Sequence, residues 1–295
     1  MSYSQYRPSG FRLLTPVIKN LLIINGIFFL ARFAIANAYQ YDIIDVFALK
    51  YPFSNKFSFW QPITYMFMHA DLGHIFFNMF ALWMFGKPLE ERFGAKRFLT
   101  YYLITGVGAA LTFYIAFYFT DIVPLIKPIN SFISDPSFSS LGKTLQYYIE
   151  GLQSSPGGNT YIAYQEILHQ KAIILDNIQR FGETPEVLSD AVARMKSFKP
   201  VLTGIYPGVV GASGSVYGIL LAFGMLWPNA MIYLYFLFPI KAKWFVIIFG
   251  ALELYLAFSQ PGSTIAHIAH VGGMIFGFIL IKIWNRRNNQ PKRFY

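Results

Sequence analysis

Six stretches of this chain are apolar enough to be predicted as membrane-spanning helices. They cover residues 21–36, 63–85, 98–119, 209–227, 244–258 and 266–283. Several approach the ~20 residues that an α-helix needs to cross a bilayer, and 98–119 carries no charged side chain. Arg32 interrupts the first stretch, and the second contains several polar and titratable residues. The pattern predicts an all-α polytopic membrane protein with six transmembrane helices.

The composition agrees with a membrane protein. Apolar residues make up 55% of the 295-residue chain and charged residues 13%, which is about half of the usual charged share of a soluble domain. The chain has no cysteine, which excludes disulfides, thiol catalysis and cysteine metal sites. No signal-peptide pattern precedes the first apolar stretch, so we expect that helix to remain as an anchor.

The net charge of +10 comes from segments at the ends of the predicted helices. Basic residues gather in the N-terminal tail, the 86–97 turn, the 240–243 turn and the C-terminal tail. Six helices place these four segments on one side of the membrane, and positive charge marks the cytoplasmic side. Both termini are therefore expected in the cytoplasm. The charges form no stripe of the kind that binds nucleic acid, so no nucleic-acid partner is expected.

Two connections are long. Residues 37–72 are dense in aromatic side chains, which favour the membrane–water interface, and are predicted as an interfacial loop. Residues 121–206 hold 8 of the 14 acidic residues and are predicted as a helical extracytoplasmic insert between helices 3 and 4. Apolar stripes predict one helix over 161–181 and another that starts at Thr184-Pro185-Glu186, a good N-terminal signal. The sequence SSPGGN at 154–159 is interpreted as a linker.

The stripes of the insert could pack on each other, on the membrane surface or on a partner, and the first is expected. The predicted organisation is a cytoplasmic tail at 1–20, helices 1–3 with their loop at 21–120, the insert at 121–206, helices 4–6 at 207–285, and a basic cytoplasmic tail at 286–295.

Titratable side chains inside the predicted helices indicate function, because they are costly in a bilayer. Small residues at 211, 214 and 218 share one helix face, and His270 shares another with Gly273 and Gly277. Small residues let helices approach closely, so Ser213 and His270 can meet as a nucleophile and a base. A hydrogen bond from Ser213 to a backbone carbonyl is the structural alternative. Ser215 competes as the nucleophile, and His267 as the base.

A second pair, His74 and Asn78, lies four residues apart and so on one helix face. Two hydrogen-bond donors aimed at one point suit a developing oxyanion, although such residues also link helices. His69, His74, His267 and His270 could instead bind a metal ion. No carboxylate or thiolate joins them convincingly in the sequence, so neither a metal nor another cofactor is expected.

In order and placement, these motifs resemble the rhomboid family of intramembrane serine proteases, from about residue 60 to residue 285. The serine motif G-x-S-G stands at Gly211-Ala212-Ser213-Gly214, H-x-x-x-N at His74 and Asn78, H-x-x-G-x-x-x-G at His270, Gly273 and Gly277, and G-x-x-x-E-x-x-x-G at Gly86, Glu90 and Gly94. The resemblance implies a six-helix bundle of the bacterial form. The chain departs from the family pattern at Trp60-Gln61, where Trp-Arg is frequent, and in the length of its insert.

The resemblance also implies the roles of the site residues. Ser213 would attack the substrate carbonyl while His270 takes its proton. His74, Asn78 and the backbone N–H of Ser213 would hold the oxyanion. The supporting residues would be Tyr217 packed against His270, together with Gly211, Gly214, Gly273, Gly277 and Glu90. The family's dyad needs no acid, and Glu253 in the fifth helix is interpreted as making a hydrogen bond within the bundle.

The substrates implied are membrane proteins cut in or near a transmembrane helix, in contact with lipid, in a bacterial cytoplasmic membrane. The first alternative is a catalytically inactive relative that binds and guides membrane proteins, and the presence of every motif residue counts against it. A transporter is the second alternative, weakened by the absence of an internal repeat.

Overall fold

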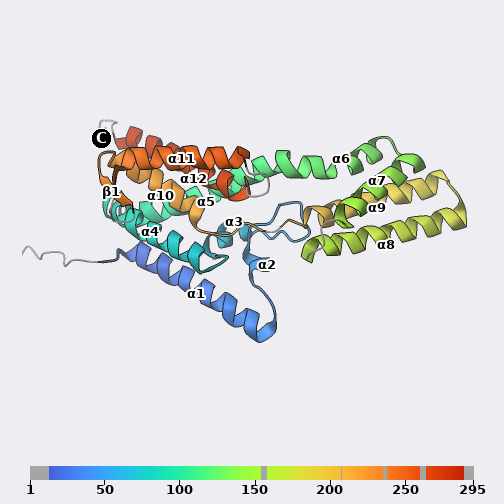
Figure 1. Cartoon of the computed structure of the whole chain (residues 1–295), viewed down its shortest axis with the longest axis horizontal. Coiled ribbons are helices and arrows are strands. Elements are labelled where there is room, and N and C mark those ends of the chain that lie inside the picture. Colours follow the sequence, from blue (N-terminus) through green and yellow to red (C-terminus); the bar gives the residue numbers. More distant parts are fainter. Residues whose placement is uncertain (1–12, 154–157, 207, 235–237, 260–263, 289–295) are drawn as a thin grey trace, which may run out of the picture. The chain divides into compact units, whose positions relative to one another are not determined.

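The computed structural model describes residues 13–153, 158–206, 208–234, 238–259 and 264–288, and most of them are helical (Figure 1). The chain divides into two compact units. The first comprises Met1–Ile43, Pro62–Phe113 and Val210–Tyr295, and the second comprises Ile44–Gln61 and Tyr114–Val209. The first long loop, 37–72, thus contributes half of its length to the unit that contains the insert.

The first unit is built from apolar helices. They are α1 (Pro16–Tyr39), α4 (Leu72–Phe93), most of α5 (Ala95–Phe117), α10 (Ser213–Leu226), α11 (Ala242–Ser259) and α12 (Thr264–Asn288). A 3₁₀ turn at Tyr65–Phe67 precedes α4, and a short hairpin of β1 (Met231–Leu234) and β2 (Phe238–Lys241) precedes α11. Helix α10 packs against α4, α11 and α12, so it is the central helix of this unit.

Four helical stretches among the described residues are long and apolar enough to cross a membrane. They are Pro16–Tyr39, Ala95–Ser134, Ala242–Ser259 and His267–Asn285. Helix α10 is apolar but has only 14 residues, and α4 has 22 residues with several polar side chains. The chain is therefore an integral membrane protein, and each of the six apolar stretches of the sequence contains a helix, four of which are long and apolar enough to span.

Several boundaries differ from the sequence prediction. Helix α4 begins at Leu72 instead of residue 63, because the Asp71 carboxylate caps it by accepting the His74 backbone N–H at 2.8 Å. Helix α10 begins at Ser213 instead of residue 209, because Gly211 has a φ of +124°. The chain at 240–243, predicted as a turn, contains the end of β2.

The ends of the chain also differ from the predicted tails. Helix α1 extends beyond 21–36 at both ends and includes Lys19, and α12 continues to Asn288, into the predicted tail at 286–295. Arg7 and Arg12 lie outside the described residues, as do 289–295.

Glu90 holds the N-terminus of α1 against the end of α4. Its carboxylate accepts hydrogen bonds from Thr15 Oγ1 at 2.5 Å and from the backbone N–H groups of Val17 and Ile18, each at 2.9 Å. The first N–H groups of a helix have no partner within it and favour a negative charge. The buried Glu90 supplies both a hydrogen-bond acceptor and a negative charge to these N–H groups. Its supporting role is therefore to join α1 to α4.

Arg32, which interrupts the first apolar stretch, is paired. Its guanidinium forms an ion pair with Asp42 at 2.7 Å and donates to the backbone carbonyls of His69 and Ala70. The charge therefore ties α1 to the segment that leads into α4.

The second unit consists mainly of the insert. It contains α6 (Val123–Ser134), α7 (Phe138–Gln153), α8 (Gly158–Phe181) and α9 (Pro185–Thr203), after a π-helical turn at Tyr118–Ile122. The sequence predicted α8 and α9 but neither α6 nor α7. Of the linker interpreted at 154–159, residues 154–157 lie outside the described residues and 158–159 belong to α8.

The helices of the insert enclose a hydrophobic core of their own, which confirms the expected packing within the insert. Ala163, Ile167 and Ile174 from α8 meet Ala191, Met195 and Phe198 from α9 in one buried cluster with residues of α6 and α7. Phe181, the last residue of the apolar stripe predicted over 161–181, is instead 65% exposed.

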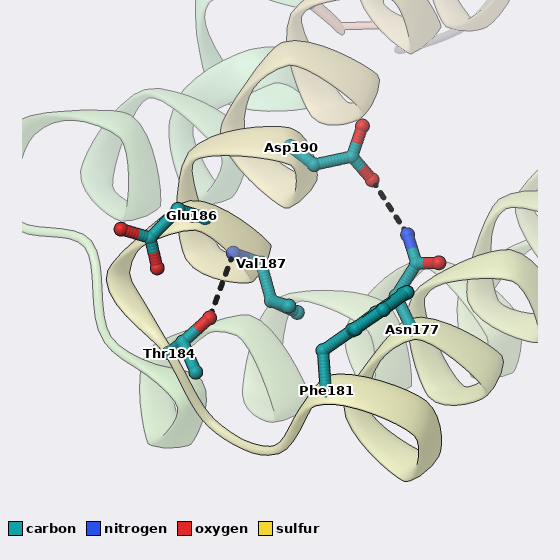
Figure 2. A pocket seen from close by; sticks show the side chains of 6 residues that line it. All are labelled: Asn177, Phe181, Thr184, Glu186, Val187 and Asp190. Atoms are coloured by element: carbon teal, nitrogen blue, oxygen red, sulfur yellow. Dashed lines mark hydrogen bonds between the residues drawn. The ribbon is translucent and has the colours of Figure 1, made fainter.

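A pocket lies at the α8–α9 turn, and Figure 2 shows its six lining residues: Asn177, Phe181, Thr184, Glu186, Val187 and Asp190. Its hydrogen bonds explain the turn. The Thr184 hydroxyl caps α9 by accepting the Val187 N–H, and Asn177 donates to Asp190.

Residues 44–61 of the first long loop also belong to this unit. Gln61, which stands where the family frequently has an arginine, is buried there. Its amide donates to the carbonyls of Val46 and Lys56 and its oxygen accepts the Lys50 N–H, so it anchors the loop, which also holds α2 (Ile44–Phe47).

Candidate active site

The site is built where α10 and α12 touch backbone to backbone. A Cβ on Gly273 would stand 1.9 Å from the carbonyl oxygen of Gly214, and one on Gly277 would stand 3.3 Å from the Cα of Gly218. Ordinary contacts between carbon atoms are about 3.5–4.0 Å. The glycines therefore allow an approach that no side chain would permit, as the sequence predicted.

Ser213 is the first residue of α10, at the bend made by Gly211. As the first residue of a helix, it has a backbone N–H with no carbonyl partner within the helix. A Cβ on Gly211 would stand 2.6 Å from His74 Nε2 and 3.5 Å from Ser213 Oγ. Gly211 thus provides both the positive φ and the space that bring the serine beside His74.

His270 meets Ser213 directly. Its Nε2 lies 2.8 Å from Ser213 Oγ, within hydrogen-bond distance. The competing residues lie elsewhere: the Ser215 hydroxyl is buried and donates to the Tyr102 carbonyl at 2.7 Å, while His267 Nδ1 contacts Glu253 at 2.6 Å. The geometry therefore pairs Ser213 with His270, and the bond to a backbone carbonyl belongs to Ser215.

Tyr217 lies one helical turn beyond Ser213 and covers the His270 ring. The two rings stack with centroids 4.2 Å apart and an interplanar angle of 10°. Stacking fixes the plane of the imidazole, and the Tyr217 hydroxyl is held in turn by the Glu253 carboxylate.

Glu253 was interpreted from the sequence as a hydrogen-bonding residue of the bundle, and no acid was assigned to the catalytic dyad. The structure places its carboxylate against His270, with Oε2 2.9 Å from His270 Nδ1. One signal could have found it, because Glu253 is the only acidic residue after Asp190 and lies in a membrane helix. The spacing of motifs along the sequence gives no information about which neighbouring helix faces His270.

His74 and Asn78 lie on one face of α4, one turn apart. The Ala70 N–H points at His74 Nδ1 at 3.4 Å, which leaves the proton of a neutral ring on Nε2, the atom nearest Gly211. Asn78 Nδ2 donates to the His74 carbonyl at 3.0 Å and has a second N–H. His69 is buried, with its ring 5.0 Å from that of His74.

The four histidines do not form one cluster in the described structure. Only His267 and His270 join a carboxylate, Glu253, in a group that could hold a metal ion. Their nitrogens lie 2.6 and 2.9 Å from a single carboxylate oxygen, which are hydrogen-bond distances. The contacts of this group are those of a hydrogen-bonded network.

Comparison with known proteins adds an independent finding. The Rhomboid domain family matches residues 56–123 and 191–287, together more than half of the chain. The residues between the two matched parts, 124–190, lie within the insert. A mitochondrial rhomboid protein of Schizosaccharomyces pombe, named as uncharacterized, is 26% identical over 239 residues, which are 78% of this chain and 52% of the relative.

Two further relatives match over shorter stretches. The rhomboid protease GlpG of Salmonella choleraesuis is 38% identical over 69 residues, which are 23% of this chain and 24% of that protein. RHOMBOID-like protein 6, mitochondrial, of Arabidopsis thaliana is 42% identical over 52 residues, 18% of this chain and 17% of that protein. The chain thus spans about half of the yeast relative and a quarter or less of the other two.

Proposed function

This chain belongs to the rhomboid family, and we propose that it is an intramembrane serine endopeptidase that works through Ser213 and His270. Family membership supports a function of the intramembrane-protease type. The observation that carries the proposal is the distance of 2.8 Å between Ser213 Oγ and His270 Nε2, because a nucleophile and its base must lie within hydrogen-bond reach.

The first step is acylation of the serine. Ser213 Oγ attacks the carbonyl carbon of the scissile peptide bond while His270 Nε2 takes the hydroxyl proton. The carbonyl oxygen becomes an oxyanion, for which the free N–H of Ser213 and the Nε2–H of His74 are suitable donors. The amide N–H of Asn78 that does not bond the His74 carbonyl is the third suitable donor. His270 then gives its proton to the leaving amine, and water hydrolyses the acyl-enzyme by the same route.

The proposed substrates are membrane-anchored proteins cut in or near a transmembrane helix. The name of the Salmonella relative, rhomboid protease, supports a protease, and the apolar helices around the site support a substrate that arrives through lipid. The insert at 121–206 joins the chain just before Ser213, so recruitment of substrates is the role that we propose for it.

The proposed topology has six membrane helices, with the insert outside the cytoplasm of a bacterium and both termini inside. The distribution of Lys and Arg supports this orientation. Because the chain has no cysteine, the topology can be tested with single cysteines. A membrane-impermeant maleimide should label Glu183→Cys, in the exposed α8–α9 turn, on intact bacterial cells. It should label Lys96→Cys, beside the α4–α5 turn, only after the cells are permeabilised.

The chemistry is tested with a fluorophosphonate probe on purified protein. We expect the wild type to label and to cleave a model transmembrane substrate, and both Ser213→Ala and His270→Ala to do neither. Ser215→Ala is the matched control, because the Ser215 hydroxyl is buried and donates to the Tyr102 carbonyl. This variant should be labelled by the probe. Wild-type protein that neither labels nor cleaves would favour the alternative, an inactive relative that binds and guides membrane proteins.

A further inference from the structure

Helix α11 carries one acidic side chain, and it is buried beside the proposed base. The Glu253 side chain is 7% exposed. A carboxylate within a membrane helix is costly unless polar groups satisfy it. Its partners therefore indicate why it is there.

Three polar side chains converge on the Glu253 carboxylate. Oε2 contacts Nδ1 of His267 at 2.6 Å and Nδ1 of His270 at 2.9 Å, and Oε1 accepts the Tyr217 hydroxyl. These partners come from α10 and α12, the two helices that carry the serine and the base. The carboxylate therefore joins both of those helices to α11.

The two contacts of His270 define which of its nitrogens carries the proton. A neutral imidazole has one donor nitrogen and one acceptor nitrogen, and an ionised carboxylate only accepts. Nδ1 therefore donates to Glu253, which leaves the lone pair of Nε2 free to take the proton of Ser213. A general base needs this tautomer.

We propose that Glu253 is a positioning residue that completes a Ser213–His270–Glu253 triad within the membrane, an inference that rests on the proposed protease function. The carboxylate holds the reactive tautomer and the ring orientation. It then stabilises the imidazolium that forms when Nε2 receives the serine proton. The proton on Nδ1 stays on nitrogen, and the proton on Nε2 passes to the leaving amine as the C–N bond breaks.

The surrounding contacts hold Glu253 in place for this role. Tyr217 stacks on His270 with its ring and bonds Glu253 with its hydroxyl, so one side chain fixes the distance between the carboxylate and the imidazole. His267 lies one turn before His270 on α12, and its Nδ1 contacts the same carboxylate oxygen of Glu253, Oε2.

Glu253→Gln is the decisive variant, because it keeps the shape and removes the charge. The glutamine amide cannot supply the negative charge that stabilises the imidazolium. If its nitrogen takes the place of Oε2, it also donates toward His270 Nδ1 and favours the unreactive tautomer. We expect kcat to fall by roughly 10²–10⁴-fold, with KM within about twofold because Glu253 contacts no substrate. The rate of fluorophosphonate labelling should fall in parallel.

The matched control is Tyr255→Phe, which removes an exposed polar group from the same helix and should keep wild-type rates. A melting temperature in detergent identifies loss of fold. If Glu253→Gln does not fold, nitrogen NMR of labelled histidine in the wild type gives an independent answer. It should find the proton of His270 on Nδ1.

The outcomes separate the two proposals. If the wild type neither labels nor cleaves, the protease function itself fails. If the wild type is active but Glu253→Gln matches its kcat, or if His270 carries its proton on Nε2, the triad is wrong and only the dyad remains. A variant that loses stability alone, with kcat unchanged per folded molecule, would make Glu253 a structural residue and would likewise overturn the triad.

Discussion

Replacing Gly273 with alanine should inactivate the protein without touching a reacting group. The added Cβ would stand 1.9 Å from the carbonyl oxygen of Gly214 and 2.7 Å from its carbonyl carbon. Carbon–oxygen contacts between packed backbones are about 3.3–3.6 Å. Because both atoms belong to helix backbones, no side chain can rotate away, and α10 and α12 must move apart by roughly 1.4 Å or more.

That movement acts directly on the site. Gly273 lies three residues after His270, and Gly214 directly follows Ser213, so the separation lengthens the 2.8 Å contact between Nε2 and Oγ. The lengthened contact exceeds the range of about 2.5–3.2 Å within which hydrogen bonds form. A misplacement of about 1 Å can reduce a rate by roughly 10²-fold. Overpacking should also lower the free energy of unfolding by about 1–3 kcal/mol.

The assay is the rate of fluorophosphonate labelling of purified Gly273→Ala, measured beside its melting temperature in detergent. Gly26→Ala is the matched control, since Gly26 lies in α1 and an added Cβ there would meet no atom of another helix within 4 Å. It should label normally and gain about 1 kcal/mol of helix stability. Wild-type labelling by Gly273→Ala would refute the reasoning, because the helices could then separate without disturbing the dyad.

Three further substitutions test other contacts. Glu90→Ala should lower the free energy of unfolding by about 1–3 kcal/mol through the lost charged cap, with unchanged labelling per folded molecule; a selective loss of labelling would contradict this. Arg32→Gln should slow labelling several-fold by releasing the segment before His74, and an unchanged rate would exclude that segment from positioning the histidine. In the insert, Met195→Ala should remove about 2–5 kcal/mol and expose the insert to trypsin, whereas the exposed Phe181→Ala should not; equal digestion of the two would argue against the buried core.

The helices could be predicted because their signals are local. An apolar stretch of membrane length predicts a span from its own residues, and each of the six stretches contains a helix of the structure. The errors lie at boundaries set by specific contacts. The Asp71 cap delays α4, and the positive φ of Gly211 delays α10 until Ser213. Helices α6 and α7 were missed, although each has an apolar face that joins the core shared with α8 and α9. Pro128 lies inside α6 and Gly142 inside α7, and both residue types usually indicate an interruption of a helix.

The sequence by itself determined the residue types of the site and the two glycine faces, since these follow from spacing along single helices. Only the tertiary structure decided which side chains meet. It paired His270, and not His267, with Ser213, and it bonded Ser215 to a carbonyl. It also brought Glu253 to His270 from a third helix. The physical reason is that helical periodicity fixes the face on which a residue lies, whereas the rotation and depth of each neighbouring helix depend on packing throughout the bundle.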